Sequence, residues 1–227
     1  MHKFIITIVL WIIGCGSRDV SMLKGEGQLP LLFGIGGRNS CSPSGNSPRA
    51  MSMYPWLEKV AAKQGLDLAL ACFDAQGIPY FESEGKVEKL SPEEIGNRLL
   101  RQSSNLTVVG HSYGGWLALE TVLRLEGVAR LYTIDPISPF ECNFVEPWRW
   151  LGCTRAPSHI PYHVISQKTV AWFNFYQTST PYLHSSEIPQ AANIHIKSRG
   201  HTEIDESPEV WDAVMGTNYA NSGDTKN

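Results

Sequence analysis

One serine in this sequence lies between two glycines at positions that indicate a tight turn. In the segment VVGHSYGGWLA (residues 108–118), Gly110 precedes Ser112 by two residues and Gly114 follows it by two. A serine on an ordinary surface loop needs no such clearance, whereas side chains at these two positions would collide around a sharp turn. A serine hydroxyl acts as a nucleophile when a base takes its proton and an acid orients that base. The spacing therefore predicts nucleophilic chemistry at Ser112.

The expected acid and base lie further along the chain. Asp135 ends the apolar segment YTID, and Glu141 is the nearest alternative acid. His201 follows the segment NIHIK on a loop that leads into the last expected helix, and His184 is the alternative base. We expect Asp205 to cap or orient that loop rather than to serve as the acid.

Two other histidines are expected to have different roles because of their positions. His111 directly precedes Ser112, so we expect its side chain to point to the opposite side from the serine. His195 alternates with apolar residues inside an expected strand, which is typical of a packed or edge position. No group of His, Cys and Asp residues in the sequence has the spacing of metal ligands, and we expect neither a metal nor a cofactor.

Apolar runs that predict strands alternate along the chain with amphipathic segments that predict helices. We expect strands over residues 29–37, 66–74, 105–110, 129–135 and 193–197, and helices over residues 54–65, 91–102, 112–127, 164–177 and 207–215. This alternation predicts an α/β fold with a mostly parallel central sheet and helices on both faces. Ser112 then lies directly after a buried strand and before a helix, whose N-terminus favours an anion.

The segments GIGG, VVGHSYGG, TIDP and GHTEID resemble those of serine lipases and esterases of the α/β-hydrolase superfamily, over about residues 29–216. The resemblance implies a small α/β-hydrolase with a nucleophile elbow at Ser112. It also implies that Asp135 is the acid and His201 the base of a catalytic triad. Placing the acid directly after the strand that follows the elbow is similar to the lipase arrangement.

The resemblance further implies an oxyanion hole made of two backbone N–H groups. Tyr113 supplies one of them, and the loop after the first strand supplies the other, from Gly36, Gly37 or Arg38. This loop is not of the HGGG form, which leaves the second donor open. The chain also lacks the first antiparallel strands of the family, so we expect a small sheet.

The first residues predict export with a lipid anchor. A basic residue precedes an apolar run over residues 4–13, which is too short to span a bilayer because that takes about 20 apolar residues. The segment IIGC resembles a bacterial lipobox, which implies a signal peptide over residues 1–14, acylation of Cys15 and a tether over residues 15–28. A plain secretory signal and a short retained anchor are the alternatives. We expect a lipoprotein held to a membrane surface in the bacterial cell envelope.

Four further cysteines can pair in an oxidising compartment. Cys142 and Cys153 bracket the aromatic segment CNFVEPWRWLGC, and we expect a disulfide between them. A pair between Cys41 and Cys72 is the less favoured alternative, because Cys72 lies in an expected buried strand where a cysteine can simply fill apolar space.

The section between the expected acid and base, residues 139–184, is rich in aromatic residues and predicts a lid-like insertion over the sheet edge that carries the site. Within it, we expect Phe144, Trp148 and Trp150 to contact the substrate or the membrane. We expect the aromatic residues of the helix over 164–177 to pack inside the protein.

Composition sets the remaining bounds. The chain has 227 residues, a formal net charge of −3 and a pI of about 6.2, which suit one domain and lack the basic footprint of a nucleic-acid-binding protein. Residues 217–227 predict a loose polar tail. Together these features predict a serine hydrolase of carboxylic esters, with lipid-like acyl groups favoured. A thioesterase or amidase with the same triad, and a lipoprotein that only binds its ligand, are the alternatives.

Overall fold

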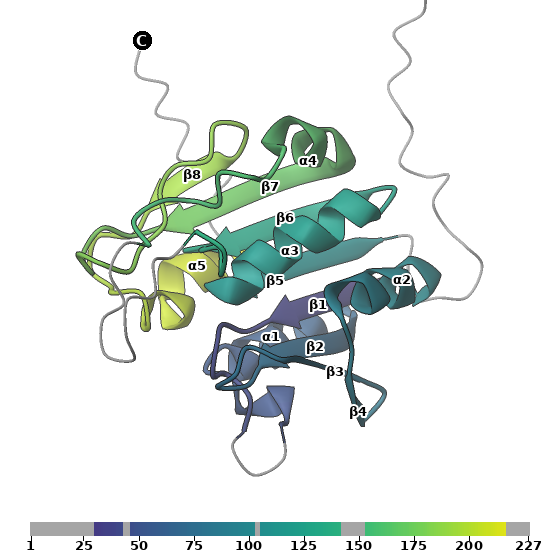
Figure 1. Ribbon diagram of the computed structural model, residues 1–227. Coiled ribbons are helices and arrows are strands. Elements are labelled where there is room, and N and C mark those ends of the chain that lie inside the picture. Colours follow the sequence, from purple (N-terminus) through teal and green to yellow (C-terminus); the bar gives the residue numbers. More distant parts are fainter. Residues whose placement is uncertain (1–29, 43–45, 103–104, 142–152, 217–227) are drawn as a thin grey trace, which may run out of the picture.

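The computed structural model describes residues 30–42, 46–102, 105–141 and 153–216, and within them eight strands form one sheet in the order β4-β3-β2-β1-β5-β6-β7-β8 (Figure 1). The strands are β1 (Leu31–Ile35), β2 (Asp67–Phe73), β3 (Pro79–Ser83), β4 (Lys86–Lys89), β5 (Leu106–His111), β6 (Val128–Ile134), β7 (Thr169–Tyr176) and β8 (Ala192–His195). Among these strands, β3 pairs antiparallel with both β2 and β4, and all the other pairs are parallel.

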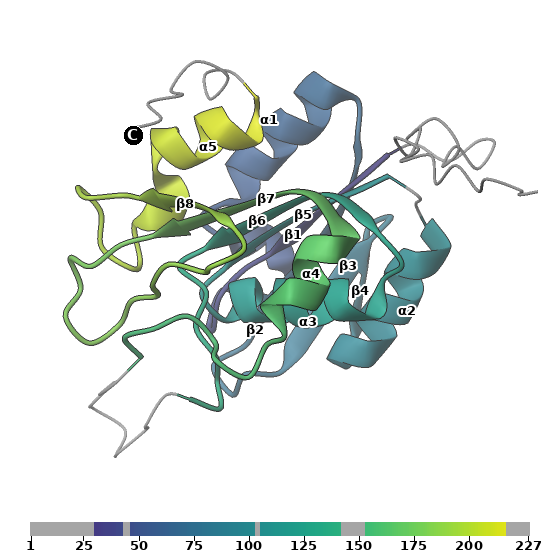
Figure 2. The same cartoon turned by 90° about the horizontal axis from the view of Figure 1, so that it is seen from above.

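Helices cover both faces of the sheet (Figure 2). One face carries α1 (Tyr54–Gln64) and α5 (Pro208–Val214), and the other carries α2 (Pro92–Gln102), α3 (Tyr113–Arg124) and α4 (Tyr162–Lys168). A separate apolar core lies between the sheet and each helix layer. The predicted α/β fold, with a mostly parallel sheet between helices, is confirmed.

Local sequence signals account for several of these elements. Helix α2 begins with a capping box, in which Ser91 N–H donates to Glu94 Oε2 at 2.7 Å and Glu94 N–H donates to Ser91 Oγ at 3.2 Å. Helix α1 ends at Gly65, whose φ of 64° lies in the left-handed region that favours glycine. Strand β5 is buried along its whole length, as its β-branched residues predict.

The register of the parallel strands brings three chain segments to one edge of the sheet. Ile35 pairs with Gly110, and His111 pairs with Ile134. The residues that follow β1, β5 and β6 therefore leave the sheet side by side, at the edge where ligands bind in open α/β sheets.

The expectation of a small sheet was wrong, because a hairpin adds β3 and β4 beyond β2. The two strands are joined by Glu84 and Gly85, which both have positive φ (53° and 74°), as a tight two-residue hairpin turn requires. Glutamate is an unusual residue at such a position, and β4 is charged and mostly exposed. The segment therefore has Glu-Gly in place of the Asn-Gly, Asp-Gly or Gly-Gly pair that predicts most two-residue hairpins.

The helix expected over residues 164–177 was also wrong. Helix α4 ends at Lys168, and the following TVAWFNFY forms β7 between β6 and β8. Aromatic and β-branched residues fit a strand that is covered on both faces, and a short apolar run cannot distinguish a buried helix from such a strand. The expected lid-like insertion over 139–184 therefore contains an integral strand of the sheet.

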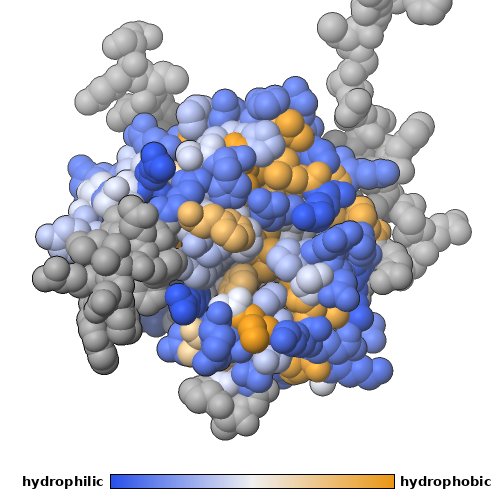
Figure 3. Space-filling model, in the orientation of Figure 1, coloured by the Kyte–Doolittle hydropathy of each residue, from blue (hydrophilic) through white to orange (hydrophobic). Residues whose placement is uncertain are grey.

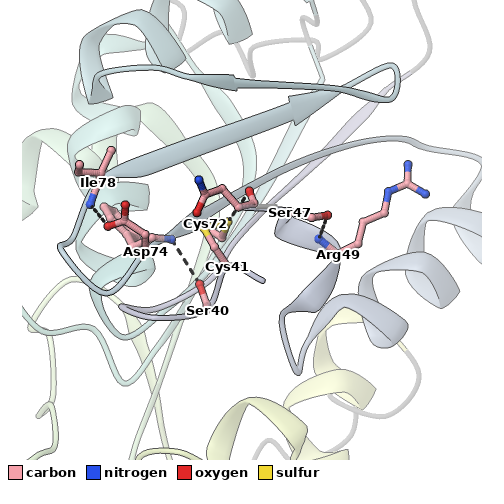
Figure 4. The surroundings of a disulfide bond; sticks show 9 residues. Ser40, Cys41, Ser47, Arg49, Cys72, Asp74 and Ile78 are labelled. Atoms are coloured by element: carbon pink, nitrogen blue, oxygen red, sulfur yellow. Dashed lines mark hydrogen bonds between the residues drawn. A yellow bond between two sulfur atoms is a disulfide. The ribbon is translucent and has the colours of Figure 1, made fainter. Parts of the chain in front are cut away.

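A disulfide joins Cys41, in the loop after β1, to Cys72 in β2 (Figure 4). This pair was the less favoured alternative, and the expectation that Cys72 is only an apolar filler was wrong. The same loop is held to the end of β2 by two bonds to Phe73 O, from Ser40 N–H at 3.0 Å and from Cys41 N–H at 3.2 Å. The chain directly after β1 is thus fixed against β2.

Several expectations fall outside the described residues. They are the signal peptide over 1–14, Cys15, the tether over 15–28, the aromatic residues Phe144, Trp148 and Trp150, and the tail over 217–227. Cys153 is disulfide-bonded, and Cys142, its expected partner, lies outside the described residues as well. No helix in the described ranges has both the length and the apolar character to cross a membrane.

Candidate active site

Ser112 occupies the sharp turn between β5 and α3. Its backbone has φ of 57° and ψ of −123°, a combination that costs a residue with a side chain of the order of 1–3 kcal/mol and persists where the surroundings enforce it. Ser112 N–H donates to Ile134 O at 2.9 Å, and Ile137 N–H donates to Ser112 O at 3.2 Å. These two bonds tie the serine turn to the turn that follows β6.

The glycines on either side of Ser112 are required by close backbone contacts. A Cβ atom at Gly110 would lie 2.3 Å from Gly114 O, and a Cβ atom at Gly114 would lie 2.2 Å from Ile35 O. Neither carbonyl can move away easily, because Ile35 lies in β1 and Gly114 lies in the first turn of α3. The first turn of α3 therefore rests directly on the end of β1.

Ser112, His201 and Asp135 form one chain of hydrogen bonds. His201 Nε2 lies 2.9 Å from Ser112 Oγ, and His201 Nδ1 lies 2.7 Å from Asp135 Oδ2. The three residues are 7%, 5% and 0% exposed, respectively. All three residues are therefore largely covered at this edge of the sheet.

Asp135 sets the tautomer of His201. A carboxylate only accepts hydrogen bonds, so Nδ1 of His201 carries the proton and Nε2 is left to accept the hydroxyl proton of Ser112. Asp135 is itself held by Ser185 N–H, which donates to Oδ1 at 2.6 Å, and by Gln177 Nε2, which donates to Oδ2 at 2.8 Å. Its φ of 45° is one that aspartate tolerates better than most residues.

His201 has a hydrogen-bond partner at each of its four polar atoms. Besides the two ring contacts, its main-chain N–H donates to Thr180 Oγ1 at 3.0 Å. Its main-chain oxygen lies 2.8 Å from Nε2 of His111. Both the ring and the backbone of this residue are therefore held in place.

The loop after β1 lies against the serine. A Cβ atom at Gly37 would be 2.9 Å from Cβ and 3.3 Å from Oγ of Ser112. Gly36 N–H is already used, because it donates to Ala71 O at 2.9 Å. Of the expected oxyanion donors in this loop, Gly36 is thus occupied, the backbone of Gly37 borders Ser112, and Tyr113 N–H opens the first turn of α3.

The side chain of Arg38 turns toward β2, where its guanidinium donates to Ala75 O at 3.1 Å and 3.0 Å. It also lies near the phenol of Tyr113. Burial raises the pKa of this phenol, and the neighbouring cation opposes that shift.

The alternative acid and base lie in other surroundings. Glu141 binds Ser158 N–H and both the N–H and the Nδ1 of His159. Burial disfavours its charge, but these donors outweigh burial and hold the pKa of Glu141 at about 2. His184 directs Nδ1 to Ser185 O at 2.6 Å. Neither residue is hydrogen-bonded to the Ser112–His201–Asp135 chain.

The supporting residues of the site could not be found by motif or spacing. Gln177 and Thr180 lie beyond the end of β7, and Ser185 lies in the irregular chain before β8. Each is a common polar residue that becomes important only through the fold. No group of three or more His, Cys, Asp or Glu side chains suited to a metal ion is found among the described residues.

Comparison with known proteins was made at three levels. No protein-family model matches the sequence, and no curated protein matches it. Among solved structures, an esterase of Pyrococcus furiosus is 13% identical with a TM-score of 0.49, covering 84% of this chain and 82% of its own. The ydeN gene product of B. subtilis is 14% identical with a TM-score of 0.48, covering 83% of this chain and 98% of its own.

A third similar structure, Est1E of Butyrivibrio proteoclasticus with bound ferulic acid, is 11% identical with a TM-score of 0.46 and covers 83% of this chain and 88% of its own. Sequence identities this low carry no information about chemistry. The chemistry must therefore be inferred from the geometry of the site.

Proposed function

We propose that this chain is a serine hydrolase of the α/β-hydrolase type that cleaves carboxylic esters. The observation that carries the proposal is the hydrogen-bond chain from Ser112 Oγ through His201 to Asp135. The serine lies in a strained turn between a strand and a helix, and the tautomer of the histidine leaves Nε2 free to accept a proton.

In the first half of the reaction, Ser112 Oγ attacks the carbonyl carbon of the ester while His201 Nε2 takes the hydroxyl proton. The resulting oxyanion is stabilised by the N–H groups of Tyr113 and Gly37, and a single donor of this kind is typically worth about 10²–10³ in kcat. The C–O bond to the alcohol then breaks, and His201 returns its proton to the departing oxygen. Asp135 stays ionised throughout and stabilises the imidazolium.

In the second half, water replaces the alcohol. His201 Nε2 takes a proton from the water as its oxygen attacks the acyl-enzyme carbonyl. The bond from that carbon to Ser112 Oγ then breaks, and Ser112 recovers the proton from His201. The products are a carboxylic acid and the resting enzyme.

Lipid-like acyl groups remain the favoured substrates because of sequence features outside the described residues. These are the aromatic residues Phe144, Trp148 and Trp150 and the expected membrane anchor. On the face drawn in Figure 3, hydrophilic residues dominate and hydrophobic residues form small groups. The aromatic segment and the expected anchor together carry the acyl preference.

A kinetic series tests this preference. The double variant Trp148→Ala/Trp150→Ala should lose kcat/KM on long-chain esters more than on acetate, because a pocket gains about 0.8 kcal/mol for each buried methylene. Equal losses at every chain length would contradict a role in acyl binding.

We also propose that the protein is exported and acylated at Cys15. The disulfide between Cys41 and Cys72 supports folding in an oxidising compartment. The variant Cys15→Ala should release the protein from the membrane fraction, since the lipid chains supply the anchoring. Unchanged partitioning into detergent would contradict the anchor.

The experiment that tests the proposed function combines a serine-directed fluorophosphonate probe with a panel of substrates. The probe should label the wild-type protein, and the panel should show p-nitrophenyl esters cleaved faster than matched thioesters and amides. Faster cleavage of a thioester or an amide would replace the ester assignment, because the triad does not determine the leaving group. An unlabelled and inactive protein would indicate a binding role.

A further inference from the structure

A second buried histidine, His111, contacts the main chain of His201. His111 Nε2 lies 2.8 Å from the main-chain oxygen of His201, and the centres of the two rings are 5.2 Å apart. His111 Nδ1 lies 3.4 Å from Oδ2 of Asp205, a buried residue in the turn that follows His201. This group takes no part in the proton transfers proposed above.

Both partners of the His111 ring are acceptors, and the shorter contact, 2.8 Å at Nε2 against 3.4 Å at Nδ1, places the proton of a neutral ring on Nε2. A carbonyl oxygen only accepts, so Nε2 of His111 is the donor to His201 O. Burial lowers the pKa of His111, against the opposing charge of Asp205, and this favours the neutral ring. A neutral ring supplies the donor without placing a second cation beside His201 when that residue takes the Ser112 proton.

Asp205 fixes the far end of the same loop. The hydroxyl of Ser52 donates to Asp205 Oδ2, and Trp211 Nε1 donates to Asp205 O at 2.7 Å. Asp205 Oδ1 is buried, and within the described residues no hydrogen-bond partner is found for it. Asp205 is thus held at its main-chain oxygen and at one carboxylate oxygen, which fixes the turn that follows His201.

The location of His111 makes it suited to couple the nucleophile and the base. It is the last residue of β5, and Ser112 is the next residue in the chain. The end of β5 therefore positions Ser112 and, through the His111 side chain, also contacts the backbone of His201. A shift of this strand end would therefore act on both residues that form the 2.9 Å contact between Oγ and Nε2.

We propose that His111 is a positioning residue for the general base, acting through the main-chain oxygen of His201, and that the Ser52–Asp205 contact supports it. The proposal rests on the proposed function, because it assigns His201 as the base. Misplacing a catalytic group by about 1 Å can cost about 10²-fold in rate. Losing the His111 donor should therefore lower kcat and leave substrate binding largely unchanged.

The test compares two variants of similar size and shape that differ in the donor. Glutamine at position 111 retains an N–H that can reach His201 O, whereas methionine does not. His111→Met should lower kcat for p-nitrophenyl acetate by about 10- to 100-fold with little change in KM, and His111→Gln should recover most of the loss. The matched control is His195→Met, which changes an exposed histidine on β8 outside this network and should leave kcat unchanged.

The rate of fluorophosphonate labelling separates this inference from the proposed function. A wild-type protein that does not react would overturn both. A reactive wild type with an equally reactive, folded His111→Met variant would overturn the inference alone, as would equal losses in the Met and Gln variants. If His111→Met does not fold, exposed Ser52 provides the test, since Ser52→Ala should still lower kcat several-fold at unchanged KM, and an unchanged kcat would overturn the inference.

Discussion

Asp135 Oδ2 lies 2.7 Å from His201 Nδ1, although 66 residues separate the two in the chain. The contact is possible because β6 ends at the same sheet edge to which the chain after β8 returns. It fixes the tautomer of His201, and with it the direction in which the Ser112 proton can move.

Replacing Asp135 by asparagine tests this contact. The amide offers no charge, so His201 loses the preference for a proton on Nδ1, and the imidazolium of the intermediate loses its counter-charge. We expect kcat to fall by about 10⁴-fold, as it does in a related triad, while the protein still folds. A folded Asp135→Asn variant with kcat within about tenfold of the wild type would show that another acid orients the base.

The tight contact between α3 and β1 predicts a large difference between two glycines. Gly114→Ala places a Cβ atom 2.2 Å from Ile35 O, so we expect a loss of about 3 kcal/mol or more in the free energy of unfolding. Gly127→Ala is the matched control, because its nearest atom, Lys168 O, is 3.9 Å away. The control should change stability by less than about 0.5 kcal/mol in urea denaturation. Similar effects of the two substitutions would contradict the described turn.

The disulfide between Cys41 and Cys72 should stabilise the protein by lowering the conformational entropy of the unfolded chain. Its half-cystines are separated by 31 positions in the sequence, and loop-closure entropy for this length corresponds to about 3–4 kcal/mol. The double variant Cys41→Ser/Cys72→Ala should lose about this amount in urea denaturation. It should also lose activity below the unfolding transition, because the freed loop carries Gly37. A variant that unfolds at the wild-type urea concentration would contradict the role of this bridge.

Burial of His111 predicts how stability depends on pH. Because the pKa of His111 is lowered in the folded state, the unfolded chain, with a histidine pKa of about 6.5, binds a proton that the folded protein does not. Stability from this residue is therefore complete above about pH 6.5 and is lost as the pH falls below it. The charged and titratable groups that face the ring are Asp205, His201 and Asp135.

The measurement for this prediction is the Tm at a series of pH values between about 7.5 and 5. His111→Gln removes the titrating group and keeps a donor to His201 O. Its Tm should therefore fall less steeply with acid than that of the wild type. Parallel curves would show that other groups control the acid sensitivity.

The sequence predicted the elements whose signals are local. The turn around Ser112 was predictable because Gly110 and Gly114 stand where close backbone contacts leave no room for a side chain. The strand before it and the helix after it also have clear patterns. The hairpin of β3 and β4 was missed because Glu84 occupies a turn position that glycine or asparagine usually marks. Strand β7 was missed because an aromatic run such as TVAWFNFY fits a buried strand and a buried helix equally well.

The only site residues that could be predicted beyond the serine turn are those that follow an expected strand. Asp135 and His201 each follow a strand, and this placed both at the sheet edge where the structure brings them together. Gln177, Thr180 and Ser185 carry no such signal, since their contacts depend on how irregular chain beyond β7 folds back over the site. The partnership of His111 with His201 likewise depends on tertiary structure, because 90 residues separate them.

The most direct test of a nucleophilic Ser112 is to locate the residue that a fluorophosphonate probe modifies. Wild-type protein should be labelled in a time-dependent manner, and peptide mass spectrometry should place the adduct on Ser112. The Ser112→Ala variant should be unlabelled and inactive while retaining the thermal unfolding transition of a folded protein. Labelling at another residue, or ester hydrolysis retained by purified Ser112→Ala, would contradict the account.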